Sequence, residues 1–216
     1  MVSFRWFGQA CFEIKDSVTI VTDPHDGDSV GLTHPDVKGD IVTISHGHFD
    51  HASGKDIVSK EDSVFVEGSG KREVKGIKVE GFDSYHDKAQ GSKRGENTIF
   101  VFELDGFEIC HLGDLGHKLS NEKIDRIKPV DILLIPVGGN YTINAQEAVD
   151  VVKELEPQII IPMHYRIKGL EVDISDEDDF IRLVKDENWE ISGEEEAKIE
   201  KLPEQRKVIK LTCKAT

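Results

Sequence analysis

The chain has few cysteines, no long apolar run and a shortage of basic residues. Its three cysteines, Cys11, Cys110 and Cys213, are far apart and form no Cys-x-x-Cys pair. Such an odd, sparse set is typical of reduced thiols, so we expect no disulfide framework and a cytoplasmic location. The apolar runs are only as long as strands, which predicts no membrane insertion. No basic region followed by an apolar one opens the chain, so no export signal is expected.

The deficit of basic residues argues against nucleic-acid partners. Lys and Arg number 27 against 42 Asp and Glu, which gives a formal net charge of −15. Sequence-independent binding to phosphate backbones relies on Lys and Arg, so the field of this protein has the wrong sign. We therefore expect a small-molecule substrate, while the oligomeric state is not indicated. No repeat, linker or low-complexity tract divides the chain, and residues 1–216 are predicted to form a single domain.

Short apolar runs separated by turn residues predict many strands. Residues 52–58 suit a loop and a short helix, and the other helices are expected in the second half. The expected strands are residues 3–7, 11–14, 18–22, 40–44, 63–68, 77–80, 98–104, 107–112, 131–136, 159–161 and 207–212. Ser120 is expected to cap one helix, Asn144 and Glu147 to form the capping box of a second, and Ser175 to cap a third, acidic one. This pattern alone is compatible with either an α/β or an α+β fold.

The densest group of polar side chains follows the predicted strand 40–44. The segment Ser45-His46-Gly47-His48-Phe49-Asp50-His51 brings three imidazoles and a carboxylate together within a few residues. These groups would repel one another if charged, whereas as neutral imidazoles and a carboxylate they are good ligands for zinc and similar ions. A surface histidine cluster or a tag fragment is the alternative. Tags, however, lie at termini and lack the interleaved Gly, Phe and Asp.

Other metal-capable residues also follow predicted strands. His86, the pair His111 and Asp114, and His164 each come just after an apolar run. A lone histidine at such a position is usually structural, but the repeated placement favours a shared site at the strand ends. By contrast, His25 and His34 fall in an early polar loop and are expected at the surface.

The ordered series His-x-His-x-Asp-His, His, Asp, His over residues 46–164 resembles the metallo-β-lactamase superfamily. The segments Gly-Asp-Leu-Gly-His and Pro-Met-His-Tyr resemble its small zinc-dependent hydrolases, which are related to lactonases and phosphodiesterases. The resemblance implies an α+β fold, a four-layer αββα sandwich with the metal site at one edge of the two sheets. It also implies a ligand set: His46, His48 and His86 for the first metal, Asp50, His51 and His164 for the second, and Asp114 bridging both. His111 is the alternative to His86, and is otherwise expected to orient ligands from outside the site.

The implied cofactors are two divalent metal ions, with zinc expected and manganese or iron also accepted by such ligands. Two ions can share a water and lower its pKa, so that a hydroxide oriented by Asp50 attacks the substrate. The expected reaction is hydrolysis of an ester, lactone or phosphodiester in a small molecule. Two alternatives remain: a nucleotide or phospholipid phosphodiesterase, and a non-catalytic metal-dependent sensor. His48 disfavours the di-iron redox members, which typically carry a carboxylate at that position.

The loop 90–97 is the most basic short stretch near the expected centre. Arg94 or Lys93 could bind a phosphate or carboxylate of the substrate. The alternative is a solvated turn whose charge has no function. Tyr165 and His117 are further candidates, for assisting the leaving group.

Overall fold

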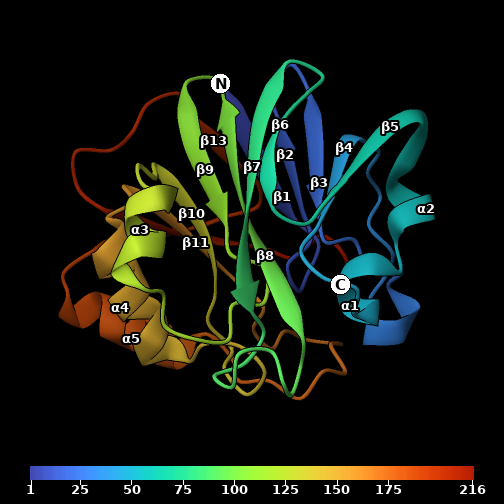
Figure 1. Ribbon diagram of the computed structural model, residues 1–216. Helices are drawn as coiled ribbons and strands as arrows, with labels where there is room; N and C mark the ends of the chain where they lie inside the picture. Colours follow the sequence, from blue (N-terminus) through green and yellow to red (C-terminus); the bar gives the residue numbers. More distant parts are fainter.

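Two β-sheets pack face to face at the centre of the computed structural model, which describes residues 1–216 (Figure 1). The six-stranded sheet has the order β13-β1-β2-β3-β4-β5, and the eight-stranded sheet the order β12-β14-β11-β10-β9-β8-β7-β6. The strands of the first sheet are β1 (Val2–Trp6), β2 (Phe12–Lys15), β3 (Thr19–Thr22), β4 (Gly39–Ile44), β5 (Ser59–Glu67) and β13 (Ala197–Ile199). Those of the second are β6 (Gly70–Val74), β7 (Ile77–Tyr85), β8 (Glu96–Leu104), β9 (Phe107–His111), β10 (Ile132–Pro136), β11 (Ile159–Met163), β12 (Glu190–Glu194) and β14 (Lys207–Leu211).

Helices cover the outer side of each sheet. Figure 1 shows α3 (Asn121–Ile127), α4 (Ala145–Leu155) and α5 (Asp178–Asp186) beside the eight-stranded sheet, with α1 (Phe49–Ala52) and α2 (Lys55–Val58) beside β4 and β5. The layers therefore follow the αββα order, and the expected sandwich is confirmed. No helix combines the length and the apolar character needed to cross a lipid bilayer.

The core lies between the two sheets and beneath the helices of the second. A single cluster of 60 buried residues joins both sheets. Every residue of β10 and β11 is buried, because these parallel strands have the other sheet on one face and helices on the opposite face. This explains why both strands are uniformly apolar, and it makes their carboxyl ends rigid supports for the loops that follow.

Two of the three predicted helix caps are confirmed. Ser120 Oγ accepts a hydrogen bond from Lys123 N (3.2 Å), and Asn144 and Glu147 form the reciprocal capping box, both bonds being 3.0 Å long. The third prediction is wrong, since α5 begins at Asp178 with Glu177 before it. Ser175 is instead fixed in the preceding loop, where its N–H donates to Gly138 O (2.9 Å) and its carbonyl accepts from Arg166 N (2.8 Å).

Strand positions in the interior agree with the predictions, while the edges differ. The β8–β9 hairpin turns at Asp105 and Gly106, both with positive φ (51° and 79°), as a two-residue turn of this sequence requires. The strands β6, β12 and β13 were not predicted. β6 and β12 are rich in charged and glycine residues and lie at edges of the eight-stranded sheet, where one side of a strand needs no apolar partner.

Candidate metal centre

Seven side chains that could hold metal ions converge from the segments that follow β4, β7, β9 and β11, with Asp50 and His51 in α1. They form two groups, and within each group the potential ligand atoms lie within 4.8 Å of one another. The first group is His46, His48 and His86, and the second is Asp50, His51, Asp114 and His164. Residues more than 100 positions apart in the sequence thus meet at one edge of the sandwich.

Asp114 connects the two groups. Its Oδ2 lies 3.0 Å from His86 Nε2, 3.2 Å from His51 Nε2 and 3.3 Å from His164 Nε2. His46 Nε2 is slightly farther from the same oxygen, at 3.9 Å. One buried carboxylate oxygen therefore faces imidazoles of both groups, which is the placement that a bridging ligand requires.

The turn that presents His164 depends on an unusual backbone conformation. His164 follows β11 with a φ of 51°, in the left-handed region. Its N–H donates to Gln9 O (3.1 Å) and its carbonyl accepts from Gly138 N (3.1 Å). A Cβ at position 138 would lie 2.3 Å from that carbonyl oxygen, so only glycine allows the two loops to approach so closely.

Buried hydrogen bonds orient the imidazoles. Asp23 accepts bonds from Ser45 N and Ser45 Oγ, both 2.6 Å long, and from His51 Nδ1 (3.0 Å), which leaves His51 Nε2 facing Asp114. On the opposite side, His86 Nδ1 donates to Tyr141 O (3.1 Å). Such outer partners fix both the tautomer and the ring orientation of metal-binding histidines.

Asp23 and Gln9 were not identified from the sequence. Asp23 follows the strand predicted at 18–22, so the strand-end placement that marked the other residues was available for it as well. Gln9 gave no comparable signal, since its role depends on tertiary contacts. Its Nε2 donates to Asp50 Oδ2 (3.0 Å) and lies 3.3 Å from His164 Nε2. Both residues support the second group.

The protonation states of most candidate ligands suit cation binding, whereas His51 would first lose a proton. Burial lowers the pKa of His46 to about 3 and also lowers the pKa of His48, so both rings are neutral at pH 7. Burial opposes the charge of Asp114, but His164 and His51 outweigh it and hold the pKa of that carboxyl well below its usual range. Burial likewise opposes the charge of His51, yet Asp114 and Asp50 raise the pKa of that ring well above its usual value.

The donor set fits divalent ions of the zinc type. His51 Nε2 and Asp114 Oδ1 are buried and make no hydrogen bond, and His46 Nε2 faces His48 Nδ1 at 3.0 Å. Tetrahedral zinc with bonds of about 2.0–2.1 Å places its ligand atoms about 3.3–3.4 Å apart. The observed separations between Asp114 Oδ2 and the three Nε2 atoms are close to this spacing, so these ligand atoms fit around such ions with little movement.

His111 lies outside both groups. Its Nε2 donates to Ala10 O (3.0 Å) and its Nδ1 accepts from Gly113 N (3.3 Å), so both ring nitrogens are already bonded. The ring therefore supports the loop that carries Asp114. Asn97 supports the same loop, because its Oδ1 accepts from Asp114 N (2.9 Å).

The expectation for His25 is wrong, because the ring is fully buried. Its Nε2 donates to Phe7 O (2.8 Å), and the close approach of Gly54 covers the His25 backbone. His34 is exposed, as expected. Tyr165 packs on Trp6 with ring centroids 4.8 Å apart, and His117 Nε2 accepts from Tyr85 N (3.1 Å). Neither Tyr165 nor His117 lines the cavity at the metal ligands.

A cavity of about 450 Å³ opens onto the candidate ligands. Besides ligands of both groups it is lined by Phe49, Arg94, Tyr141, Glu171 and Asp173, among others. The Arg94 guanidinium lies over the Tyr141 ring, 4.3 Å from its centre. Phe49 is 56% exposed, so an apolar surface is available at the rim.

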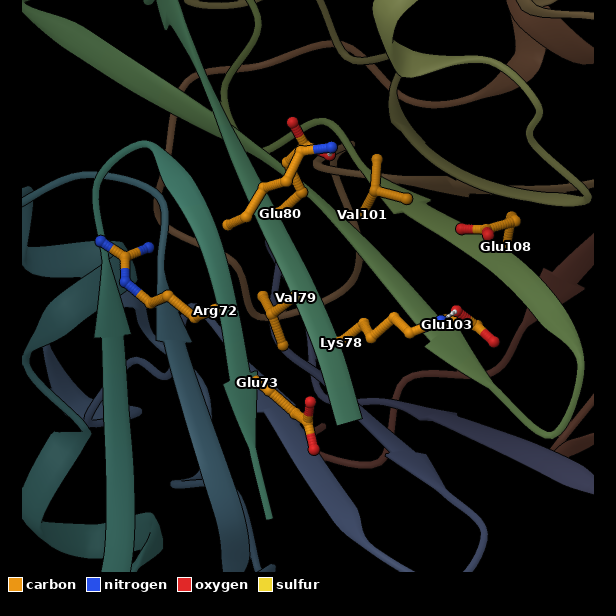
Figure 2. A pocket seen from close by; sticks show the side chains of 9 residues that line it. Arg72, Glu73, Lys78, Val79, Glu80, Val101, Glu103 and Glu108 are labelled. Carbon is orange, nitrogen blue, oxygen red and sulfur yellow. Dashed lines mark hydrogen bonds and ion pairs between the residues drawn. The ribbon is translucent and has the colours of Figure 1, made fainter. Parts of the chain in front are cut away.

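A second hollow lies on β6 to β9 (Figure 2). Its charged side chains pair largely with one another, as Lys78 with Glu103 (2.7 Å) and Lys71 with Glu80 (3.3 Å). It contains no histidine or cysteine. The cavity at the metal ligands is therefore the better candidate for a reaction site.

Comparisons with known proteins agree with this geometry. The family model described as "Beta-lactamase superfamily domain" matches residues 3–164. A UPF0173 metal-dependent hydrolase of Thermococcus onnurineus is 32% identical over 76% of this chain and 85% of its own length, and one of Thermoplasma acidophilum is 30% identical over 74% and 81%. A crystal structure from Thermotoga maritima, a candidate Zn-dependent hydrolase of the metallo-β-lactamase superfamily, has a TM-score of 0.80, 37% identity and 98% coverage of both chains. The chain therefore belongs to the metallo-β-lactamase superfamily, among its metal-dependent hydrolases.

Proposed function

We propose that the protein uses two divalent metal ions, zinc being expected, to hydrolyse an ester, lactone or phosphodiester bond in a small molecule. The observation that carries the proposal is the contact of one Asp114 oxygen with imidazoles of both ligand groups. We assign His46, His48 and His86 to the first ion, Asp50, His51 and His164 to the second, and Asp114 to both. His111 has no free ring nitrogen, which supports His86 as the third ligand of the first ion.

When bound, two such ions lower the pKa of a shared water and polarise the scissile carbonyl or phosphoryl oxygen. The neutral rings of His46 and His48 offer their lone pairs without first losing a proton. Burial opposes the charge of Asp50, but His51 outweighs it and lowers the pKa of that carboxyl. Asp50 is therefore ionised and able to accept a hydrogen bond from the attacking water. Gln9, bonded to Asp50 Oδ2, fixes the direction of this acceptor.

The two alternatives, a metal-dependent sensor and a nucleotide or phospholipid phosphodiesterase, have less support. A purely structural zinc site closes with four protein ligands, whereas here a cavity of about 450 Å³ reaches ligands of both groups. This opening favours catalysis over a metal-dependent sensor. A nucleotide or phospholipid phosphodiesterase shares the same centre and differs only in what the cavity accepts, so substrate trials separate it from an esterase or lactonase.

The test is a panel of bis-p-nitrophenyl phosphate, an aryl ester and a lactone, each with added zinc or manganese. Asp50→Ala and His48→Ala should lower turnover by about 10²–10⁴-fold while the chain stays folded by circular dichroism. Asp56→Ala is the matched control, since Asp56 is exposed and follows the same motif by a few residues. Wild-type rates in either ligand variant would end the proposal. No turnover of any of the three substrates with metals fully bound would support the alternative of a non-catalytic metal-dependent sensor.

A further inference from the structure

We propose that Arg94 forms an anion-binding subsite beside the metal centre, so that the substrate carries a carboxylate or phosphate group, and that Asp87 is the positioning residue which holds Arg94 there. The inference rests on the proposed function, since it names the class of substrate that the same cavity accepts. It is carried by the way the loop between His86 and Gly95 is built.

The Asp87 carboxylate organises this loop from within. Asp87 is only 7% exposed, although it lies in a polar loop. Its Oδ1 accepts from Ala89 N (2.6 Å) and Gly91 N (3.1 Å), and its Oδ2 accepts from Lys93 N (3.0 Å) and Arg94 N (2.8 Å). Four backbone N–H groups bonded to one carboxylate hold this loop rigidly, because hydrogen bonds to a charged acceptor are stronger than hydrogen bonds between neutral groups.

Backbone hydrogen bonds also close this loop beside the candidate ligand His86. His86 N donates to Gly95 O (3.1 Å), and Gly95 N donates to Gly91 O (2.8 Å). Arg94 then places its guanidinium over the ring of Tyr141, the residue whose carbonyl accepts the His86 Nδ1 bond. Arg94 is therefore fixed beside the candidate ligand His86, whose ring is held separately by the Tyr141 carbonyl.

Arg94 has no carboxylate partner in the chain, although most basic side chains near the surface do. It lines the same cavity as His48, His86 and Asp114, and its planar donor fork suits carboxylate and phosphate groups. A guanidinium that is held in place, stacked on an aromatic ring and left without a counter-ion can pair with an anionic group of a ligand.

The same cavity has two acidic residues that orient such a ligand. Glu171 and Asp173 line it, are exposed and form no ion pair. Their charges repel an anionic group, which leaves Arg94 as the one favourable position for it outside the metal centre. The substrate is thus directed with its anionic group toward Arg94 and its scissile bond toward the ions.

The first experiment compares two aryl esters with the same leaving group, p-nitrophenyl acetate and mono-p-nitrophenyl succinate, in the zinc-loaded protein. Arg94→Ala should lower kcat/KM for the succinate ester by about 10–100-fold and for the acetate ester by less than about 3-fold, because it removes a charge-assisted bond that only the former makes. Arg94→Lys should be intermediate. Glu171→Gln should have the opposite effect and raise kcat/KM for the succinate ester, because it removes a negative charge from the cavity. Equal losses on both esters in Arg94→Ala would overturn the proposal.

The second experiment tests the role of Asp87. Asp87→Asn keeps the shape but loses the charge, so we expect a higher KM for the succinate ester, little change in kcat, and faster hydrogen exchange of the backbone amides at residues 89–94. Asp83→Asn is the matched control, because Asp83 is an exposed carboxylate close in sequence whose side chain makes no hydrogen bond to the loop. Unchanged exchange in Asp87→Asn, or a loss confined to kcat, would overturn the positioning role.

Failure of the proposed hydrolysis can be told apart from failure of the subsite. Inorganic phosphate binding to the zinc-loaded protein is measured by calorimetry in the wild type and Arg94→Ala. If no ester is turned over but Arg94→Ala weakens phosphate binding about 10-fold, the anion-binding subsite is supported and the proposed hydrolysis is refuted. Equal phosphate affinity in the two proteins would refute the subsite whatever the activity.

Discussion

Replacement of Asp23 by Asn tests whether the orientation of His51 is set by a buried carboxylate. Asp23 is fully buried and accepts three hydrogen bonds, two from Ser45 and one from His51 Nδ1. The burial disfavours its charge, but the bond from His51 outweighs this and lowers the pKa of the carboxyl. Asn keeps one acceptor oxygen and turns the other into a donor. If Oδ1 still accepts from Ser45 N, the new NH₂ group replaces Oδ2 and faces both the Nδ1–H of His51 and the hydroxyl of Ser45.

The expected losses follow from these contacts. Removing one partner of a buried charged pair costs about 3–5 kcal/mol, because the other charge stays buried without compensation. Here Asn retains the bond from Ser45 N and His51 keeps Asp114 and Asp50 as charged neighbours, so we expect the lower end of this range, about 3 kcal/mol, in the metal-free protein. Loss of an outer partner of a metal-binding histidine typically weakens metal affinity by about 10–100-fold, and we expect the same here.

The assay combines urea unfolding of the metal-free protein with zinc competition against a chromogenic chelator. Asp28→Asn is the control, because Asp28 begins the short helix η1 (Asp28–Val30) with an exposed side chain and should change neither quantity. A variant Asp23→Asn with unchanged zinc affinity would refute the claim that this carboxylate orients a ligand. Lower stability with unchanged affinity would restrict Asp23 to a structural role.

Two further predictions concern protons and packing. In the metal-free protein the raised pKa of His51 adds stability that is complete below the unfolded value of about 6.5 and is lost as pH rises through the folded pKa. Urea unfolding should therefore show that the stability of the wild type falls above pH 6.5, and that the stability of His51→Gln falls less. Calorimetry at pH 7 should show that zinc binding releases the His51 proton. Zinc binding without proton release would contradict the raised pKa of His51. Gly116→Ala would place a Cβ 2.3 Å from His86 C and 2.5 Å from Asp87 N, so we expect a loss of about 1–3 kcal/mol in thermal unfolding and weaker zinc binding. Gly193→Ala, whose Cβ meets nothing within 4 Å, is the control, and equal effects of the two variants would refute the steric argument.

The interior of the fold could be predicted because its signals are local. The uniformly apolar β10 and β11, the capping box at Asn144 and the turn at Asp105 and Gly106 each depend on a few neighbouring residues. Edge strands such as β6 carry charged residues on exposed faces, so no apolar alternation marks them. Ser175 has the chemistry of a cap, but its backbone is bonded to two other loops and the helix begins later.

The candidate site was predictable to the extent that its residues follow strands. The four segments with His or Asp after an apolar run do meet at one edge, because strand ends in a sandwich share that edge. The supporting residues could not be predicted in the same way. Gln9 and Tyr141 act through tertiary contacts, with the Tyr141 carbonyl holding His86, and His25 packs against a glycine more than 25 positions away.

The most direct test of the paired metal centre is anomalous X-ray diffraction from crystals of the zinc-loaded protein. We predict two peaks about 3.5–4 Å apart on either side of Asp114, one near His46, His48 and His86 and the other near Asp50, His51 and His164. A single peak, or two peaks that do not share Asp114, would contradict the account.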